Sequence, residues 1–245
     1  MSARSNTFFH FTKDLNTLTK IISDGFWPKY CLEDISWQKF NGYDFFAFPM
    51  VCFCDIPITR IDEHVNFYGK YGIGMSREWG EKNGLNPVFY ISGNGPAYNA
   101  AHSIVRISKK IDDPDESKNA SDIIGDFVAY VKPTRGLMYV SGKPQEKEFY
   151  QESEWRYLPK SEDIIPFMPE SDFRNKDRLD QCHELTNNHC MLTFKPEDIR
   201  YIILEKDSEI PKMVDHIQNG TTKTSNEEKI LISRIISLES IRHDF

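Results

Sequence analysis

Two carboxylates and an arginine occupy alternate positions in the segment FYQESEWRYLP, residues 149–159. If this segment is a strand, Glu152, Glu154 and Arg156 share one face, because successive side chains point to opposite sides of a sheet. Carboxylates two residues apart on a strand lie roughly 7 Å apart, so each raises the pKa of the other unless a cation offsets them. Two interpretations follow. Either Arg156 neutralises the pair within the fold, or the pair stabilises positive charge on a ligand.

A histidine lies inside the apolar run TFFHFT, residues 7–12. Alternation places His10 on one face with Phe8 and Thr12, and Phe9 with Phe11 on the other. A histidine among apolar neighbours is usually a core residue whose nitrogens are satisfied. A polar pair at the end of a strand is also typical of a sheet that presents groups to a cleft, so His10 and Thr12 are candidate binding residues.

A third group follows the segment CFCDIP. Ile61, His64, Tyr68 and Tyr71 are spaced by three, four and three residues, which places them along one stripe of a helix. Such a stripe is commonly part of a core. His64 and Tyr68 would each need a hydrogen-bond partner if buried, so a binding role is an equally good interpretation.

The segment CHELTNNHC, residues 182–190, contains two cysteines and two histidines. Each cysteine is adjacent to a histidine, and the CxxC and HxxxH spacings of tetrahedral zinc sites are missing. The sequence therefore predicts no metal site. Five cysteines at irregular spacing indicate reduced thiols, and Cys52 and Cys54 lie in an apolar strand pattern where a buried thiol is the default.

The elements that must position these residues are read from periodicity and from capping signals. Thr12 is the expected N-cap of the first helix and Gly25 its end, and residues 26–48 read mostly as loop. Residues 112–119 read as a loop between two helices, and residues 159–180 as a charged region punctuated by prolines. The expected strands are residues 7–12, 50–55, 71–75, 87–92, 149–158, 190–194 and 200–205, and the expected helices are residues 59–68, 96–111, 120–131 and 211–220.

Composition points to one mixed domain. The chain has 245 residues, of which 39% are hydrophobic, and a net charge of -7. We expect a single α+β domain over residues 1–245. The acidic balance provides no global field that attracts nucleic acid. The N-terminal residues lack a signal-peptide pattern and no apolar run is long enough to span a bilayer, so we expect a cytoplasmic protein that does not enter the membrane.

Six segments in order, namely FFHFT, PMVCFCDIPIT, HVNFYGKYGIGMSREWG, NPVFYI, FVAYVKP and ESEWRYLP, resemble the AbiGi family. The CFCDIP and YGKYGIG stretches make this resemblance specific, and it covers most of the chain. It implies a role in abortive phage resistance, as the antitoxin of a toxin–antitoxin pair.

A broader resemblance concerns the order of the polar residues. A strand-borne histidine, a later aromatic and a glutamate on a late strand are similar to the His-Tyr-Glu order of ADP-ribosyltransferases, and ESE is similar to the ExE pattern of the branch that modifies arginine. This resemblance implies a split β-sheet core with flanking helices and NAD as the substrate. It implies that His10 holds the adenosine ribose, that Tyr68 or Tyr71 stacks on nicotinamide, that Glu154 binds the nicotinamide ribose and that Glu152 orients the acceptor. The neighbouring residues implied in NAD binding are Phe11, Thr12, His64 and Arg156.

Two functions are therefore predicted. The first is NAD-dependent ADP-ribosylation of a protein or nucleic-acid acceptor in phage defence, which the retained His-Tyr-Glu order favours. The second is a non-catalytic antitoxin that binds a partner toxin, which the acidity of the chain favours if that toxin is basic.

Overall fold

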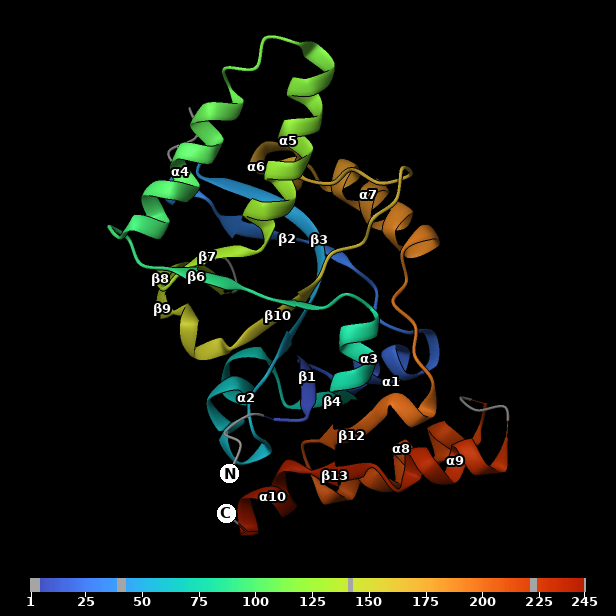
Figure 1. The fold of residues 1–245 in the computed structure, drawn as a ribbon. Helices are drawn as coiled ribbons and strands as arrows, with labels where there is room; N and C mark the ends of the chain where they lie inside the picture. Colours follow the sequence, from blue (N-terminus) through green and yellow to red (C-terminus); the bar gives the residue numbers. More distant parts are fainter. Residues whose placement is uncertain (1–4, 39–42, 141–142, 221–223, 245) are drawn as a thin grey trace. The chain divides into compact units, whose positions relative to one another are not determined.

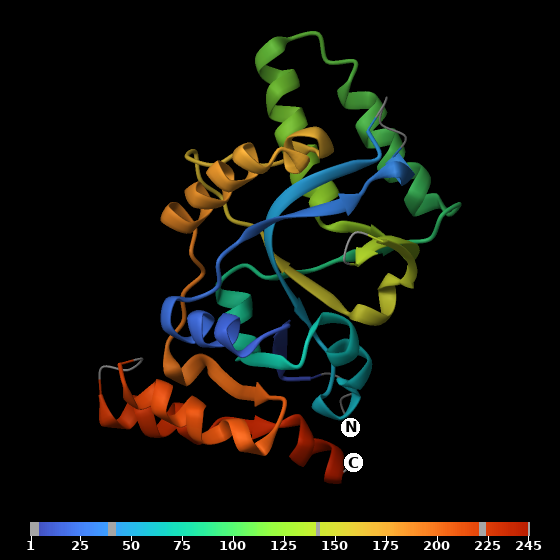
Figure 2. The same cartoon turned by 180° about the vertical axis from the view of Figure 1, so that it is seen from behind.

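The computed structural model describes residues 5–38, 43–140, 143–220 and 224–244. The chain divides into two compact units (Figures 1 and 2). Unit 1 comprises residues 1–27, 52–85 and 191–245, and unit 2 comprises residues 28–51 and 86–190. The chain thus crosses four times between the units, and strand β3 (Phe45–Cys54) contains one of these crossings.

Unit 1 is built on a mixed sheet. Strand β4 (Tyr71–Ser76) pairs antiparallel with β1 (Thr7–Thr12) on one side and with β12 (Ile199–Leu204) on the other. Strand β13 (Ile235–Ser237) pairs parallel with β12, and Phe9 of β1 pairs with Cys54 at the end of β3. The expected strands at residues 7–12, 71–75 and 200–205 are confirmed to within one residue at each end.

The two faces of β1 have different environments. Phe9 belongs to an apolar cluster with Val65 of helix α2 (Asp62–Tyr68) and with Ile61, the N-cap residue of this helix. Leu238 of α10 (Leu238–Asp244) is part of the same cluster. His10 points to the other face, because neighbouring strand residues alternate. Helix α2 therefore packs on the face of β1 that His10 does not occupy.

Helix α1 (Leu15–Asp24) shows how local sequence sets the boundaries in unit 1. Asp14, and not the expected Thr12, is its N-cap: the Asp14 carboxylate accepts a hydrogen bond from the Thr17 N–H at 2.9 Å, while Thr12 ends β1. The helix buries one apolar stripe and ends before Gly25, as expected. The other helices of unit 1 are α3 (Arg77–Lys82), α8 (Ile210–Gln218) and α9 (Ser225–Ile232).

Unit 2 contains strands of a larger sheet, together with two two-stranded sheets. Strand β2 (Lys29–Asp34) pairs antiparallel with β3, which also pairs with β11 (Met168–Pro169). Strand β10 (Glu154–Tyr157) pairs with β5 (Asn86–Pro87), β6 (Phe89–Ile91) pairs parallel with β7 (Val131–Pro133), and β8 (Arg135–Val140) forms a hairpin with β9 (Lys143–Glu148).

The described residues of unit 2 also form four helices. Helices α4 (Pro96–Ser108) and α5 (Pro114–Ala129) lie side by side in both views (Figures 1 and 2). The short helix α6 (Glu170–Arg174) precedes α7 (Lys176–His189). The predicted α+β class is confirmed by this mixture of helices and strands.

Several sequence-based predictions of elements are wrong. Residues 26–48 are not mostly loop, because they contain β2 and the start of β3. Residues 112–119 are not a loop, because α5 begins at Pro114 with Asp113 as N-cap. Residues 190–194 form only an isolated bridge through Leu192 instead of a strand. The charged residues 159–180, for which no element was predicted, contain α6 and the start of α7.

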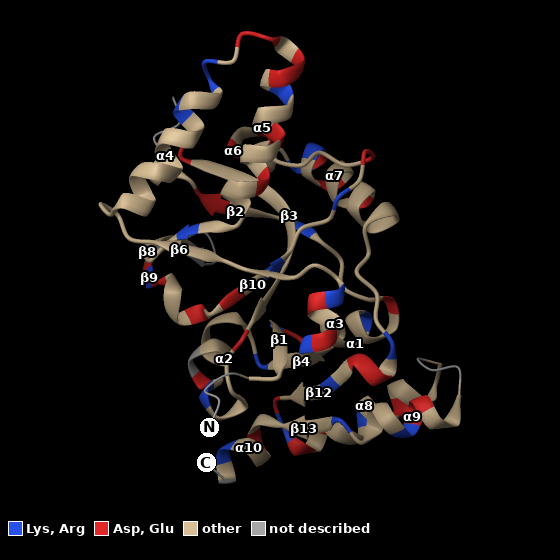
Figure 3. Ribbon diagram, viewed as in Figure 1, with Lys and Arg blue, Asp and Glu red and all other residues tan. Residues whose placement is uncertain are grey.

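The described part of the chain has no helix that is both long and apolar enough to span a membrane. Lys and Arg are interspersed with Asp and Glu along the ribbon in Figure 3, in agreement with the modest net charge.

Candidate functional site

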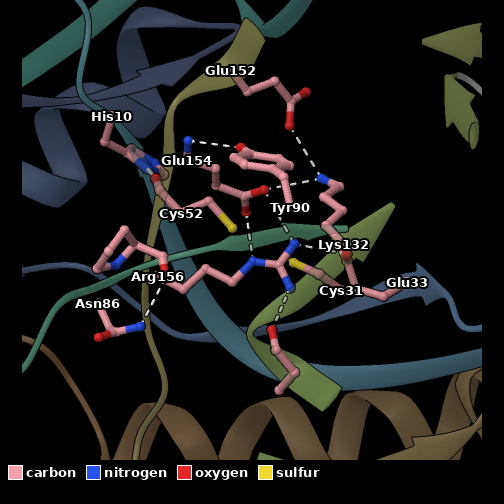
Figure 4. Close-up of polar contacts among 12 residues, drawn as sticks. His10, Cys31, Glu33, Cys52, Asn86, Tyr90, Lys132, Glu152, Glu154 and Arg156 are labelled. Atoms are coloured by element: carbon pink, nitrogen blue, oxygen red, sulfur yellow. Dashed lines mark hydrogen bonds and ion pairs between the residues drawn. The ribbon is translucent and has the colours of Figure 1, made fainter. Parts of the chain in front are cut away.

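The carboxylate pair of the sequence analysis lies in a buried cluster of charges in unit 2 (Figure 4). Three carboxylates and three cations form this cluster, which we call the charged cluster. Its members come from β2, β7, β9, the 3₁₀ turn Phe149–Glu152 and β10, and they are Glu33, Lys132, Lys147, Glu152, Glu154 and Arg156.

Both oxygens of the Glu154 carboxylate accept hydrogen bonds from cations. Arg156 Nε donates to Oε1 at 2.7 Å, and Oε2 receives Lys132 Nζ at 3.0 Å and Arg156 Nη2 at 3.1 Å. Glu154 is only 6% exposed. Arg156 therefore neutralises this carboxylate, as in the first of the two interpretations of the sequence, and Lys132 adds a second cation.

Arg156 connects Glu154 to β2. The residue is completely buried, and its guanidinium also donates to the Glu33 carboxylate at 2.7 Å and to the Ala129 carbonyl at 2.5 Å. Four polar contacts on one planar guanidinium fix its orientation, which is typical of buried arginine.

Glu152 binds the two lysines of the cluster. Lys132 Nζ lies 3.1 Å from Glu152 Oε2, and Lys147 Nζ lies 2.6 Å from Oε1. Burial alone lowers the pKa of Lys132, but the carboxylates of Glu154, Glu33 and Glu152 outweigh burial and raise that pKa above its ordinary value. Lys132 is therefore held in its charged form. Burial dominates at Lys147 and lowers its pKa, against the opposing effect of Glu152.

The backbone at Glu152 and Glu154 is not the continuous strand predicted from the sequence. Residues Phe149–Glu152 form a 3₁₀ turn, and Ser153 adopts a left-handed conformation with φ 45° before β10 begins. The prediction of a continuous strand over residues 149–158 is wrong for this reason. The turn nevertheless directs Glu152 toward Lys132, the same lysine that Glu154 contacts.

Three members of the charged cluster were not identified from sequence. Glu33 and Lys132 lie far from FYQESEWRYLP in the chain. Lys147 lies on β9, just before this segment. The available signal was a charged side chain inside an apolar strand pattern, as in VKP at residues 131–133. Tyr90 adds a further polar contact, because its hydroxyl accepts the Glu154 backbone N–H at 3.0 Å.

The remaining predicted site residues lie in unit 1. The His10 ring contacts Phe26 and Phe53, and its Nδ1 lies 2.8 Å from the Cys52 carbonyl. Because a carbonyl only accepts, Nδ1 carries the proton and Nε2 is left as the acceptor when the ring is neutral. Burial lowers the pKa of His10, with the Cys52 carbonyl acting in the opposite direction, so the ring is neutral at physiological pH.

The register of β1 and β4 distinguishes the two tyrosines. Thr12 pairs directly with Tyr71, and His10 pairs with Ile73. Paired residues of antiparallel strands share a face, so Tyr71 lies on the face of His10 and Thr12. The Tyr71 hydroxyl donates to Glu209 at 2.7 Å. Phe11 lies on the opposite face, where its ring stacks with that of Phe9.

Tyr68 and His64 lie on helix α2, with their ring centroids 5.5 Å apart. Since this helix packs on the Phe9 face of β1, the structure does not bring Tyr68 to the His10 face. The stripe of four residues predicted from helical spacing also ends at Tyr68, because Tyr71 belongs to β4.

No group of three or more potential metal ligands occurs within the described ranges. Cys182 and His183 lie on α7, which ends at His189, and Cys190 follows it. The His183 ring accepts the Tyr30 N–H at 3.2 Å, and Cys182 is buried in an apolar cluster with Tyr30. These contacts show that Cys182 and His183 pack within unit 2.

The half-buried thiol of Cys31, beside the charged cluster, provides a test of its electrostatics. Burial, and then the Glu33 carboxylate, raise the pKa of Cys31 to about 12. We expect iodoacetamide to alkylate Cys31 at least about 100-fold more slowly in the folded protein than in denaturant near pH 8, because the thiolate is the reacting form. Peptide mass spectrometry after timed labelling measures both rates. Equal rates would contradict the raised pKa.

Comparison with known proteins gives one family and one curated relative. The family described as "Putative abortive phage resistance protein AbiGi, antitoxin" matches residues 24–205. The relative, called "Abortive phage resistance protein AbiGi", comes from Lactococcus lactis subsp. cremoris. It is 27% identical over 250 residues, covering 90% of this chain and 99% of the relative. No solved structure matches the chain.

Proposed function

This chain belongs to the AbiGi family of abortive phage resistance proteins, and we propose that it acts as an antitoxin that binds and neutralises a partner toxin. The observation that carries this proposal is the internal neutralisation of the charged cluster. The family description, which includes the word antitoxin, supports the same function.

The charged cluster has the properties of a structural element. A carboxylate that stabilises an oxocarbenium-like transition state must direct its charge at the substrate. Both oxygens of Glu154 are already engaged by Arg156 and Lys132, and Glu152 is engaged by Lys132 and Lys147. Three cations balance three carboxylates in the cluster, so its carboxylates are occupied in holding β2, β7 and β10 together.

The net charge agrees with a binding function. A chain with a charge of -7 attracts a basic partner over long range and accelerates their encounter. Salt screens such attraction, with a Debye length of about 8 Å at physiological ionic strength. We therefore infer that association with the toxin is slower at high salt.

The experiment is neutralisation in cells. Proteins encoded beside this gene are expressed singly and then together with it, and growth is measured. We expect one neighbour to arrest growth alone, co-expression to restore growth, and the two proteins to copurify at low salt. Arrest by a neighbour that co-expression does not relieve, with no copurification, would contradict the proposal.

The second candidate function is NAD-dependent ADP-ribosyl transfer, and the register of β1 and β4 favours it. His10 and Thr12 share a face with Tyr71, which pairs with Thr12, and a ligand ribose and nicotinamide could use these groups. In this candidate, His10 and Thr12 bind NAD, Tyr71 stacks on nicotinamide and Glu154 stabilises positive charge on the ribose. It also requires the split-sheet fold of ADP-ribosyltransferases.

Nicotinamide release separates the two candidates. An ADP-ribosyltransferase should release nicotinamide from NAD, with a loss of about 10²-fold to 10³-fold in Glu154→Gln, and His10→Ala should weaken NAD binding. The antitoxin proposal expects no release by the wild type with any protein or nucleic-acid acceptor. If the wild type releases nicotinamide and this release depends on Glu154, the enzymatic function replaces the antitoxin proposal. This conclusion requires that both variants retain the wild-type unfolding midpoint.

A further inference from the structure

A pocket in unit 1, whose lining includes none of the site residues proposed above, is rich in arginine. Its volume is about 590 Å³, within the range of small-ligand sites. The pocket is lined by Asn6, Thr7, Ser76, Arg77, Glu78, Arg200, Tyr201, Ser233, Arg234, Ile235 and Ile236. The lining therefore includes three arginines and one glutamate, although the chain as a whole is acidic.

The three arginines differ in their contacts. Arg77 pairs with Asp55 at 2.6 Å and donates to the Ser5 carbonyl at 2.9 Å, so the fold holds it in place. Arg234 Nε is buried and has no hydrogen-bond partner among the residues that the structure describes. A buried donor without an acceptor costs free energy, and the cost is larger for a charged group than for a neutral one. A ligand acceptor would remove that cost.

The backbone at Arg200 is irregular. Ile199 pairs with Met75 and Tyr201 with the adjacent Gly74, so Arg200 is the extra residue of a bulge in β12. Bulges redirect a side chain and are frequent beside functional sites. Arg200 is exposed and enters none of the ion pairs of the described residues. Its guanidinium is thus available to a ligand in the pocket.

The lining offers two kinds of contact. Guanidinium forks match the oxygens of a phosphate in a bidentate manner. Tyr201, Ile235 and Ile236 are the apolar part of the lining. The Tyr201 ring stacks on Phe9 with one face, and aromatic rings also stack on nucleic-acid bases. We propose that this pocket binds a phosphate-bearing nucleotide, with Arg200 and Arg234 on the phosphates and Tyr201 beside the base.

Calorimetric titration of the full chain tests the site with ATP, adenosine and inorganic phosphate. ATP should bind, and adenosine should bind at least about 10-fold more weakly because it lacks the phosphates. Arg200→Ala and Arg234→Ala should each weaken ATP binding by about 10-fold to 100-fold. Arg106→Ala, which removes an exposed arginine of α4, is the matched control and should leave binding unchanged.

A second variant keeps the test decisive. Glu78→Gln removes the carboxylate of the lining, so it should tighten ATP binding if the ligand is an anion. Arg200→Ala changes an exposed side chain, and its unfolding midpoint should equal that of the wild type. The proposal is overturned if ATP does not bind, if neither arginine variant weakens binding, or if Glu78→Gln weakens it. Tighter binding of a glutamate-rich peptide or of a single-stranded oligonucleotide that ATP does not displace would also overturn it.

Discussion

Replacing Arg156 with methionine is expected to lower the free energy of unfolding by about 3–5 kcal/mol, the usual effect of removing one partner from a buried ion pair. Methionine keeps much of the volume, so the loss is electrostatic. Glu154 and Glu33 would each lose a cation, and the Ala129 carbonyl would lose its donor. Lys132 would remain beside Glu154 and would limit the loss. Urea denaturation measured by circular dichroism gives the change.

An exposed arginine provides the matched control. Arg174 pairs with Glu170 one turn earlier on α6, and its side chain is 60% exposed. Arg174→Met should therefore change the free energy of unfolding by about 1 kcal/mol or less. In the Arg156→Met background, Glu154→Gln should restore part of the loss, because it removes a buried carboxylate that has lost one of its two cations. Equal effects of the two arginine variants would contradict a structural role for the charged cluster.

The elements predicted correctly are those that carry a local signal in the sequence. The short apolar runs TFFHFT and YGIGMS identify β1 and β4, because such runs are typical of strands buried on both faces, and most residues of both strands are buried. Helix α8 has a strong apolar stripe and ends before Gly220, and its prediction was similarly accurate. Caps and periodicity are sufficient where the fold follows local preference.

The missed elements lacked such a local signal or carried a misleading one. Helix α7 is polar along most of its length, and only Cys182 and Thr186 are buried, so no apolar stripe marks it. The strand expected at residues 50–55 begins earlier, at Phe45, and Pro49 lies within it and pairs with Tyr30 of β2. The start of α5 did have a signal, since Asp113 caps it and Pro114 takes the first helical position, but the charged composition favoured a loop.

The charged cluster also has one part that the sequence predicted and one part that it did not. The spacing of Glu152, Glu154 and Arg156 predicted a carboxylate pair that needs compensation, which is a local property. Lys132 and Glu33 reach this pair through the pairing of distant strands, and no spacing in the sequence specifies it. Similarly, Tyr71 rather than Tyr68 shares the His10 face because Thr12 pairs with Tyr71, and that register is a tertiary property.

The junction between α2 and β1 should be the most sensitive glycine position of unit 1. Gly69 ends α2 with φ 132°, and a Cβ added there would lie 2.1 Å from the Thr12 carbonyl oxygen and 2.6 Å from the Lys13 nitrogen. Both contacts are to backbone, so no side chain can rotate away. Gly69→Ala should therefore lower the free energy of unfolding by about 3–5 kcal/mol, the combined effect of backbone strain and overpacking.

Gly220 separates these two contributions, because it has the same φ of 132° and an added Cβ would meet no described atom within 4 Å. Gly220→Ala should lower the free energy of unfolding by about 1–3 kcal/mol, which is the strain alone. The difference between the two variants then measures the contact of Gly69 with the end of β1. Since β1 carries His10 and Thr12, a loosened Gly69 junction should also increase amide hydrogen exchange in β1, whereas Gly220→Ala should not. Equal destabilisation by the two variants, with unchanged exchange in β1, would show that α2 does not hold the end of this strand in place.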